Sequence, residues 1–259
     1  MKLSIIIPAY NEGNRIGITL EKYGEFFKEK VISKELKGFE MVIVLNACKD
    51  NTLEVVKKWQ KKYKSIKILN FKRGGKGFAL TEGFKDALTR KNDLIGFVDA
   101  DMATSPEAYY DLVKNIGQRG GIIASRWLKK SKAERSFKKY VRSKGFNFLV
   151  RSMLLVNQRD TQCGAKLFKR DVLEKIVPLF IITEWAFDIN LLFLCKQNKF
   201  KIREFPTVWV DKEESKINFA RTPLQMLLGA MRLRIIYSPF SFVIRIYDKF
   251  PRWLKIKIK

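Results

Sequence analysis

Short apolar runs alternate with amphipathic stretches through the first half of the chain. The apolar runs lie at residues 3–7, 39–45, 66–71 and 94–98. Runs of this length, bounded by turn residues, are typical of buried strands. Helical patterns follow them, reaching the region 21–30, covering 52–63, and ending at Leu88. Repeated strand–helix units predict an α/β fold, with a Rossmann-like, mostly parallel sheet and helices on both faces.

The second half of the chain has a less regular pattern. Residues 122–124 predict a short strand, residues 172–195 a helix and residues 205–210 another strand. From Pro223 onward the spacing of apolar residues predicts amphipathic helices.

The end of the chain, residues 252–259, interleaves cations with apolar side chains. This pattern suits a segment lying in a membrane interface, and a frayed basic terminus explains it equally well. We therefore expect one α/β domain over residues 1–222 and an amphipathic, basic, membrane-associating tail over residues 223–259.

An acidic pair, Asp99 and Asp101, directly follows the apolar run 94–98. Successive strand residues point to opposite faces, so these carboxylates converge only where the strand ends and the chain turns. That carboxyl edge is where open α/β sheets bind ligands. Paired carboxylates suit a hard divalent cation that takes its other ligands from water and phosphates. A solvated turn is the alternative explanation.

Polar residues also follow the first two strands. Pro8 ends strand pairing, and Tyr10 and Glu12 offer a ring and a carboxylate to a base or a ribose. Asn46 offers an amide that can contact a nucleobase edge. A structural turn accounts for the first group as well, and helix capping accounts for Asn46.

A glycine-rich turn, residues 73–77 with the sequence R-G-G-K-G, follows the third strand. Glycines let backbone N–H groups approach an anion closely, and the next helix presents its positive end. Lys76 within the turn is a candidate for the phosphates of a nucleotide. The spacing matches neither a P-loop nor a dinucleotide fingerprint, so an ordinary tight turn remains the alternative.

The charge of the chain is strongly unbalanced, because 52 Lys and Arg stand against 26 Asp and Glu, for a net charge of +26. Such a balance favours anionic partners: nucleic acid, an acidic membrane surface or phosphorylated substrates. Residues 126–151 are the most basic stretch, with Glu134 as their only acid. A solvated face or a patch for anionic lipid would have the same composition.

The chain contains no histidine, which excludes Ser-His and Cys-His nucleophiles and zinc sites built on histidine. Cys48, Cys163 and Cys195 are scattered, which favours a reducing compartment over a disulfide framework. No stretch of about 18 uncharged apolar residues is present, and the N-terminus does not resemble a signal peptide. We expect a cytoplasmic protein, peripheral on the inner face of the membrane.

Taken in order, Pro-x-Tyr-Asn-Glu, the glycine-rich turn and Asp-x-Asp resemble glycosyltransferase family 2, which has the nucleotide-diphospho-sugar-binding GT-A fold. Within that family, residues 160–168 (D-T-Q-C-G-A-K-L-F) resemble the D-T-Q-C-G-F-K-L-F segment of dolichyl-phosphate β-glucosyltransferases. Residues 99–104 (D-A-D-M-A-T) are similar to their D-A-D-G-A-T. Residues 185–188 match their W-A-F-D, and residues 209–216 are similar to their W-x-E-x-x-G-S-K.

The resemblance implies a role for each candidate residue. The expected catalytic residues are Asp99, Asp101, Arg126 and Asp188. The expected contacts to the donor nucleotide are Pro8, Tyr10, Glu12, Asn46, Lys76 and Asp99. The expected contacts to the acceptor phosphate are Arg126, Lys139 and Ser143, and those to the sugar or acceptor are Gln162 and Lys216. Asp101, together with Asp99, would hold Mg2+ or Mn2+.

Some features depart from the family pattern. Its second strand usually ends in one or two Asp residues, where this chain has Leu45 and Asn46. The related dolichol-phosphate mannosyltransferases typically carry a Gln or a similar ligand where this chain has Ala103. Eukaryotic relatives also carry an N-terminal membrane anchor that this sequence lacks, so attachment would come from elsewhere.

The resemblance implies an inverting transfer of a hexose, with UDP-glucose as the expected donor and a polyprenyl or dolichyl phosphate as acceptor. GDP-mannose as donor, or a soluble saccharide as acceptor, stays open. A basic nucleic-acid-binding protein is the alternative of another class. The acids at the motif positions would repel nucleic-acid phosphates, so we expect no nucleic-acid partner and an anionic membrane surface instead.

Overall fold

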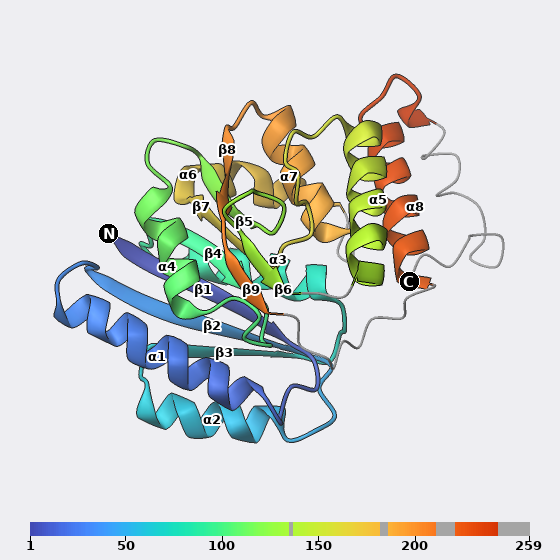
Figure 1. Ribbon diagram of the computed structural model, residues 1–259. Coiled ribbons are helices and arrows are strands. Elements are labelled where there is room, and N and C mark those ends of the chain that lie inside the picture. Colours follow the sequence, from blue (N-terminus) through green and yellow to red (C-terminus); the bar gives the residue numbers. More distant parts are fainter. Residues whose placement is uncertain (135–136, 182–185, 211–220, 243–259) are drawn as a thin grey trace.

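The computed structural model describes residues 1–134, 137–181, 186–210 and 221–242 (Figure 1). The strands are β1 (Lys2–Ala9), β2 (Gly38–Asn46), β3 (Ile66–Phe71), β4 (Leu94–Val98), β5 (Gly121–Ser125), β6 (Lys132–Glu134), β7 (Ala165–Lys169), β8 (Ile202–Pro206) and β9 (Val208–Val210). The helices are α1 (Ile16–Ile32), α2 (Thr52–Lys62), α3 (Lys76–Leu88), α4 (Pro106–Asn115), α5 (Phe137–Leu154), α6 (Arg170–Ile176), the 3-10 turn η1 (Val177–Leu179), α7 (Phe187–Gln197) and α8 (Arg221–Ile236).

Within the described residues, seven strands form one sheet in the order β3-β2-β1-β4-β7-β5-β8. Strands β1 to β4 are parallel, as the repeated strand–helix pattern predicts. Strand β7 is antiparallel to both of its neighbours, β4 and β5, while β8 returns parallel to β5. The first four strands therefore end at the same edge, and β7 begins beside the end of β4.

Helices cover both faces of the sheet (Figure 1). On one face, α1, α2 and α4 bury a cluster centred on Leu20, Tyr23, Phe27 and Tyr109. On the other face, α3, α6 and α7 bury a second cluster that includes Phe84 and Phe187. The apolar runs of the central strands are buried from both sides, which explains why they read as continuous rather than alternating. The expected α/β architecture is confirmed.

A third hydrophobic cluster joins α8 to the rest of the fold. Ala230 and Leu233 of α8 pack with Val150 of α5 and with Ile189 and Phe193 of α7. The first part of the expected tail therefore shares a core cluster with helices of the preceding domain. Residues 243–259 lie outside the described residues. Over the part of the chain that is described, no helix combines the length and apolarity needed to cross a bilayer.

The sequence interpretation was wrong at two places in the second half. Residues 172–195 do not form one helix: α6 ends at Ile176, Pro178 lies in the 3-10 turn, and α7 begins at Phe187. Proline lacks the N–H that an α-helix needs. Residues 205–210 form parts of two strands, because β8 pairs with β5 while β9 pairs with β6. Strand β7 was not predicted at all.

Strand β7 and helix α4 lie so close to β4 that Gly96 has no room for a side chain. A Cβ atom at this position would lie 2.2 Å from the carbonyl oxygen of Lys166 and 2.3 Å from the hydroxyl of Tyr109. We expect G96A to lower the free energy of unfolding by about 3 kcal/mol, because backbone atoms must move. The matched control is G145A at an exposed position of helix α5, where a Cβ meets nothing within 4 Å. G145A should raise stability by up to about 1 kcal/mol. Denaturant unfolding measures both, and equal effects would contradict the packing described.

Candidate active site

The carboxyl edge of the sheet is organised by the amide of Asn46 at the end of β2. Its Nδ2 donates to the carbonyl of Ala9 at 2.8 Å, and its Oδ1 accepts from the backbone N–H of Gly75 at 3.1 Å. Gly75 has a φ of 122°, in the region that glycine tolerates. Asn46 therefore ties the end of β1 to the glycine-rich turn that starts α3. This contact differs from the helix capping considered from the sequence.

The turn after β1 is held to the turn after β2. The backbone N–H of Glu12 donates to Thr52 Oγ1 at 2.8 Å, and the N–H of Gly13 donates to Asp50 Oδ2 at 3.0 Å. The Glu12 carboxylate is paired with Arg15. Pro8 is half-buried at the end of β1, and Tyr10 is exposed. Tyr10 thus presents an accessible ring beside a rigid turn.

Asp99 comes directly after β4 and contacts both neighbouring elements. Its backbone N–H donates to the carbonyl of Gly164 at 3.1 Å, and its Oδ1 lies 2.7 Å from Lys76 Nζ at the start of α3. A Cβ atom on Gly164 would lie 1.9 Å from Asp99 Oδ2. Glycine at 164 is therefore required for the Asp99 carboxylate to occupy this position.

Charges of alternating sign continue from Asp99 into the core. Lys76 Nζ also lies 3.9 Å from Asp188 Oδ2, and the fully buried Lys166 donates to Asp188 Oδ1 at 2.5 Å. Lys166 also donates to the carbonyl of Cys163 at 2.6 Å. These four side chains, Lys166, Asp188, Lys76 and Asp99, form what we call the charge ladder. Unpaired charges in such a buried place would be very costly, and each one here faces an opposite charge.

Electrostatics within the charge ladder favour the cationic form of Lys76 and disfavour the ionised form of Asp99. Burial alone would lower the pKa of Lys76, but Asp99, Asp188 and Asp101 together raise it above its ordinary value. Burial raises the pKa of Asp99, and Asp101 and Asp188 add to this, while Lys76 opposes it. A cation bound beside Asp99 and Asp101 would therefore stabilise the ionised form of Asp99.

Asp101 lies in a loop that several elements hold in place. Its Oδ1 accepts from the backbone N–H of Ala103 at 3.0 Å. From α1, Thr19 donates to the carbonyl of Ala100 at 2.7 Å and Tyr23 donates to the carbonyl of Thr104 at 2.9 Å. The acidic pair is therefore presented on a rigid loop rather than on a solvated turn.

The acidic pair fits a hard cation that shares its ligands with phosphate. In the described ranges, no three His, Cys, Asp or Glu side chains gather as a metal site. Asp99 and Asp101 would supply two oxygen ligands, which is the usual share of protein ligands for Mg2+ bound with a phosphorylated substrate. Gly164 leaves room for the Asp99 carboxylate itself.

Arg126, which follows β5, forms a bidentate ion pair with Asp160. Nε donates to Oδ2 at 2.7 Å and Nη2 donates to Oδ1 at 2.8 Å. The Cζ atom of Arg126 lies over the Trp209 ring, 5.2 Å from its centre. Asp99 is among the groups that raise the pKa of Arg126, after the larger effects of burial, which lowers it, and of Asp160. The arginine is therefore within electrostatic reach of Asp99.

The remaining candidates have different outcomes. Gln162 is half-buried, and its Nε2 has no hydrogen-bond partner among the residues described. Ser143 lies on α5, where its carbonyl accepts from Asn147 at 3.0 Å. The side chain of Lys139 and the whole of Lys216 lie outside the described residues.

Sequence reasoning missed the importance of residues 160–166, which run into β7. Of these it assigned a role only to Gln162. The structure shows Asp160 bound to Arg126, Gly164 against Asp99, and Lys166 bound to Asp188. This segment therefore touches three of the four expected catalytic residues. The resemblance of this segment to D-T-Q-C-G indicated that it matters. Its contacts could not be predicted, because they depend on where β7 inserts in the sheet.

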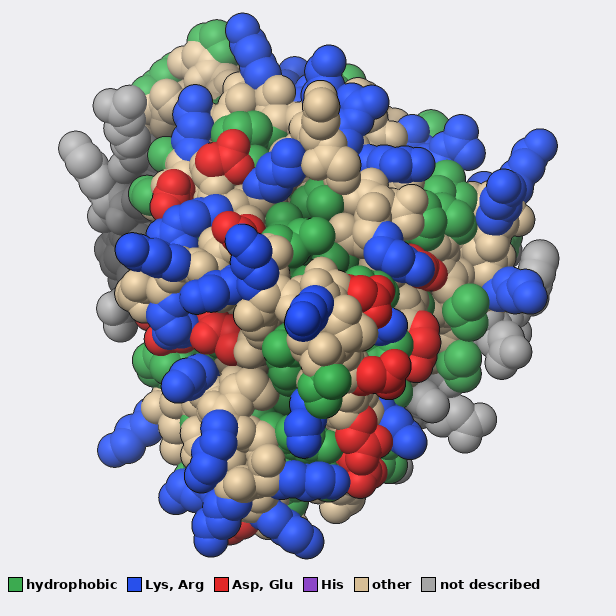
Figure 2. Space-filling model, turned by 90° about the vertical axis from the view of Figure 1, so that its left-hand side faces the viewer, with side chains coloured by type: hydrophobic (Ala, Val, Ile, Leu, Met, Phe, Trp, Pro, Cys, Tyr) green, Lys and Arg blue, Asp and Glu red, His purple; other side chains and the backbone are tan. Residues whose placement is uncertain are grey.

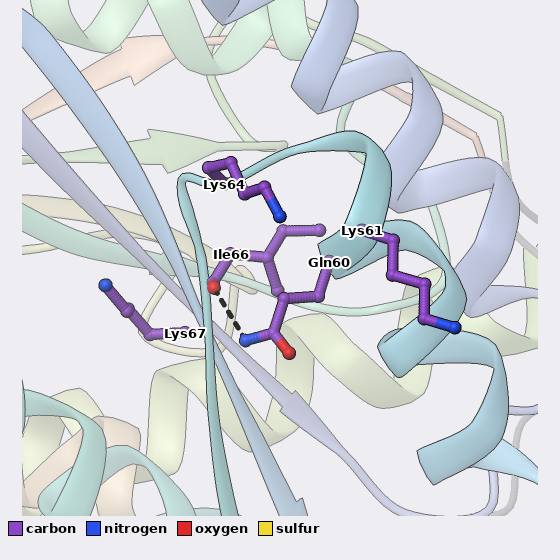
Figure 3. A pocket seen from close by; sticks show the side chains of 5 residues that line it. All are labelled: Gln60, Lys61, Lys64, Ile66 and Lys67. Carbon is purple, nitrogen blue, oxygen red and sulfur yellow. Dashed lines mark hydrogen bonds between the residues drawn. The ribbon is translucent and has the colours of Figure 1, made fainter.

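A hollow of about 230 Å³ lies away from this edge, lined by Gln60, Lys61, Lys64, Ile66 and Lys67 (Figure 3). It lies where β3 begins, whereas the candidate site lies where the strands end. Gln60 Nε2 donates across it to the carbonyl of Ile66 at 3.0 Å. The hollow does not belong to the acidic site.

Basic side chains are widespread on the surface. Figure 2 shows the side of the molecule on which the chain begins, with Lys and Arg scattered over the face and Asp and Glu between them. The net positive charge is therefore not confined to the surroundings of Arg126.

Comparisons with known proteins agree with the fold and the motifs. Residues 4–177 match the family model described as glycosyl transferase family 2. A dolichyl-phosphate beta-glucosyltransferase of Dictyostelium discoideum is 32% identical over 251 residues, covering 91% of this chain and 74% of that protein. The Homo sapiens dolichyl-phosphate beta-glucosyltransferase is 30% identical over 248 residues, covering 91% of this chain and 76% of that protein.

A solved structure shares the fold at low sequence identity. Glucosyl-3-phosphoglycerate synthase from Mycobacterium tuberculosis, crystallised with Mg2+ and uridine diphosphate, superposes with a TM-score of 0.66 at 13% identity. The match covers 90% of this chain and 79% of that one. The expected nucleotide-diphospho-sugar transferase fold is confirmed. Family model, relatives and fold agree, and the chain belongs to glycosyltransferase family 2.

Proposed function

We propose that this protein transfers glucose from UDP-glucose to a polyprenyl phosphate such as dolichyl phosphate, with inversion at the anomeric carbon. One observation carries the proposal. An acidic pair suited to a metal-bound diphosphate lies at the same sheet edge as a buried arginine, Arg126, that is suited to a second anion. The relatives named dolichyl-phosphate beta-glucosyltransferase support this choice of substrates.

The donor would bind across the ends of β1, β2 and β4. Tyr10 and Glu12 would lie beside the nucleoside, and Lys76 would contact the diphosphate. Asp101 and Asp99 would hold Mg2+ or Mn2+, which would stabilise the leaving nucleotide diphosphate and remove the need for an acid to protonate it. Asn46 would act by fixing the glycine-rich turn, because its amide is bound to Ala9 and Gly75.

The acceptor needs little activation. A phosphate monoester has a second pKa of about 6, so its oxygen is already a nucleophile near neutral pH. A strong general base is therefore unnecessary, in agreement with a chain that contains no histidine. Asp188 lies between Lys166 and Lys76, so it would serve mainly to position Lys76. Direct in-line displacement then converts an α-linked donor sugar into a β-linked product.

The lipid part of the acceptor would reach the site from the side of α5 and α8, which pack side by side (Figure 1). Large apolar side chains are exposed on and near these helices: Phe148, Leu149, Leu155, Met231, Tyr237, Phe240 and Phe242. Lys and Arg side chains near such a surface can reach toward anionic headgroups. We infer a peripheral association with an anionic membrane surface through this face.

The activity is tested with a donor panel. UDP-glucose, UDP-N-acetylglucosamine and GDP-mannose are incubated with polyprenyl phosphate and Mg2+ or Mn2+, and label is followed into the organic extract. We expect transfer from UDP-glucose, and an at least 100-fold loss in D101N, because a metal at this position contributes several kcal/mol to the transition state. The control is D111N, which removes a surface carboxylate paired with Lys114.

Other outcomes would change the proposal. Preferred transfer from GDP-mannose would assign a mannosyltransferase, and transfer to oligosaccharides alone would replace the lipid acceptor. Equal activity of D101N and the parent protein would remove the acidic pair from the mechanism.

The membrane face is tested by sedimentation with vesicles. We expect the protein to bind vesicles of anionic phospholipid more tightly than neutral ones, with F148S and F240S combined weakening binding about tenfold or more, because each phenyl group loses apolar burial. The control is I32S on α1, since Ile32 and Phe148 are both 70% exposed. Equal loss of binding in I32S would show that the assay measures nonspecific hydrophobic adsorption rather than binding through this face.

A further inference from the structure

Asp160 is a fully buried carboxylate that accepts three hydrogen bonds from Arg126. Both of its oxygens accept from the guanidinium, and Oδ2 also accepts from the backbone N–H of Arg126 at 2.9 Å. Its own side chain is 0% exposed, and that of Arg126 is 12% exposed. The carboxylate therefore fixes the arginine at its backbone and at the end of its side chain.

Asp160 is itself fixed by neighbouring groups. Its backbone N–H donates to Glu204 Oε1 of β8 at 3.0 Å, and its Oδ1 accepts from the N–H of Gln162 at 3.3 Å. Next to it, Thr161 donates through its N–H and its hydroxyl to Asn147 Oδ1 on α5. The residue that holds Arg126 is thus anchored to β8 directly and to α5 through its neighbour Thr161.

The pair is electrically balanced. Burial alone would raise the pKa of Asp160, but Arg126 lowers it below its ordinary value. The carboxylate is therefore ionised at neutral pH and compensates the charge of the arginine. Because the pair has no net charge, it would attract an anion mainly through the fixed direction of the Arg126 N–H groups.

The shape of guanidinium explains why such an arrangement is useful. Arginine carries five N–H donors in one plane, and the ion pair uses Nε and Nη2 along one edge. The ion pair along one edge and the Trp209 ring beneath Cζ together fix the direction of the guanidinium plane. Phosphate oxygens match that planar geometry, which lysine cannot reproduce.

We propose that Asp160 is a positioning residue for the acceptor: it orients Arg126 so that the guanidinium binds the phosphate monoester of the lipid. This inference rests on the proposed function. It assigns a role to the first residue of the D-T-Q-C-G segment, which otherwise would be only a structural ion pair. Asp160 does not contact the acceptor itself.

Removal of Arg126 should lower the stability of the protein in a pH-dependent way. In R126M, Asp160 is left buried without its partner, so its pKa rises and its ionised form opposes folding. We expect the melting temperature at pH 7.5 to fall by about 8 °C, and the difference from the parent protein to shrink as the pH is lowered toward 5, where Asp160 takes up a proton. D160N in the R126M background should restore part of the loss at pH 7.5. A pH-independent difference would contradict the ionised pair.

The role in acceptor binding is tested with a double-mutant cycle on D160N, R126M and the double variant. The KM for a short-chain prenyl phosphate, the kcat and the affinity for UDP are measured for each. We expect D160N and R126M each to raise this KM about tenfold or more and to leave UDP affinity within twofold. The double variant should be no more than about twofold worse than R126M, because Asp160 acts through Arg126. R126K should not recover the parent KM.

The control is the same cycle on Arg90 and Glu40, an ion pair 2.7 Å apart where β2 begins. R90M and E40Q should lower the melting temperature without changing the ratio of KM to kcat. Two results would overturn the inference while the proposed function stands. One is an unchanged KM in D160N, and the other is a KM of the double variant that equals the product of the two single effects. If the parent protein transfers no sugar to prenyl phosphate from any donor, the proposed function fails and this inference fails with it.

Discussion

Compensation of buried charge at the carboxyl edge of the sheet is the constraint on which the rest of the site depends. Asp99, Lys76, Asp188 and Lys166 carry alternating charges from the surface to the core. Burying Asp188 and Lys166 would be very costly without an opposite charge beside each of them. Each member therefore fixes the next one, and together they determine where a diphosphate and a metal ion could be accommodated.

The ion pair of Arg126 and Asp160, on the other side of β7, is a second case in which a buried charge is compensated by an opposite one. Segment 160–166 supplies one partner to each system, Asp160 to the arginine and Lys166 to Asp188. Between them, Gly164 leaves room for the Asp99 carboxylate. A single segment thus sets the spacing between the acidic half of the site and the half that would bind a second anion. These contacts hold the segment on both sides of the proposed reaction.

This division of charge suits a transfer between two anionic substrates. The acidic half would need a divalent cation before it could hold a diphosphate, whereas the charge of Arg126 is already balanced by Asp160, so the arginine would select an anion by the direction of its N–H groups. Neither half contains a histidine or a reactive thiol: burial raises the pKa of Cys163 to about 11, so its thiol stays protonated at neutral pH. Catalysis would then rest on placing ions, with little proton transfer by side chains.

The sequence by itself determined the first four strands, the helices between them and the placement of Asp99, Asp101, Asn46 and Lys76 at one sheet edge. Those features follow from local periodicity, because a buried strand and the turn after it are encoded in consecutive residues. Only the tertiary structure decided the insertion of antiparallel β7 between β4 and β5. It also decided the separation of residues 205–210 into two sheets and the partners of Asp160, Lys166 and Asn46. The physical reason is that strand pairing and charge compensation join residues distant in the chain, and no local pattern records which distant residue will lie opposite.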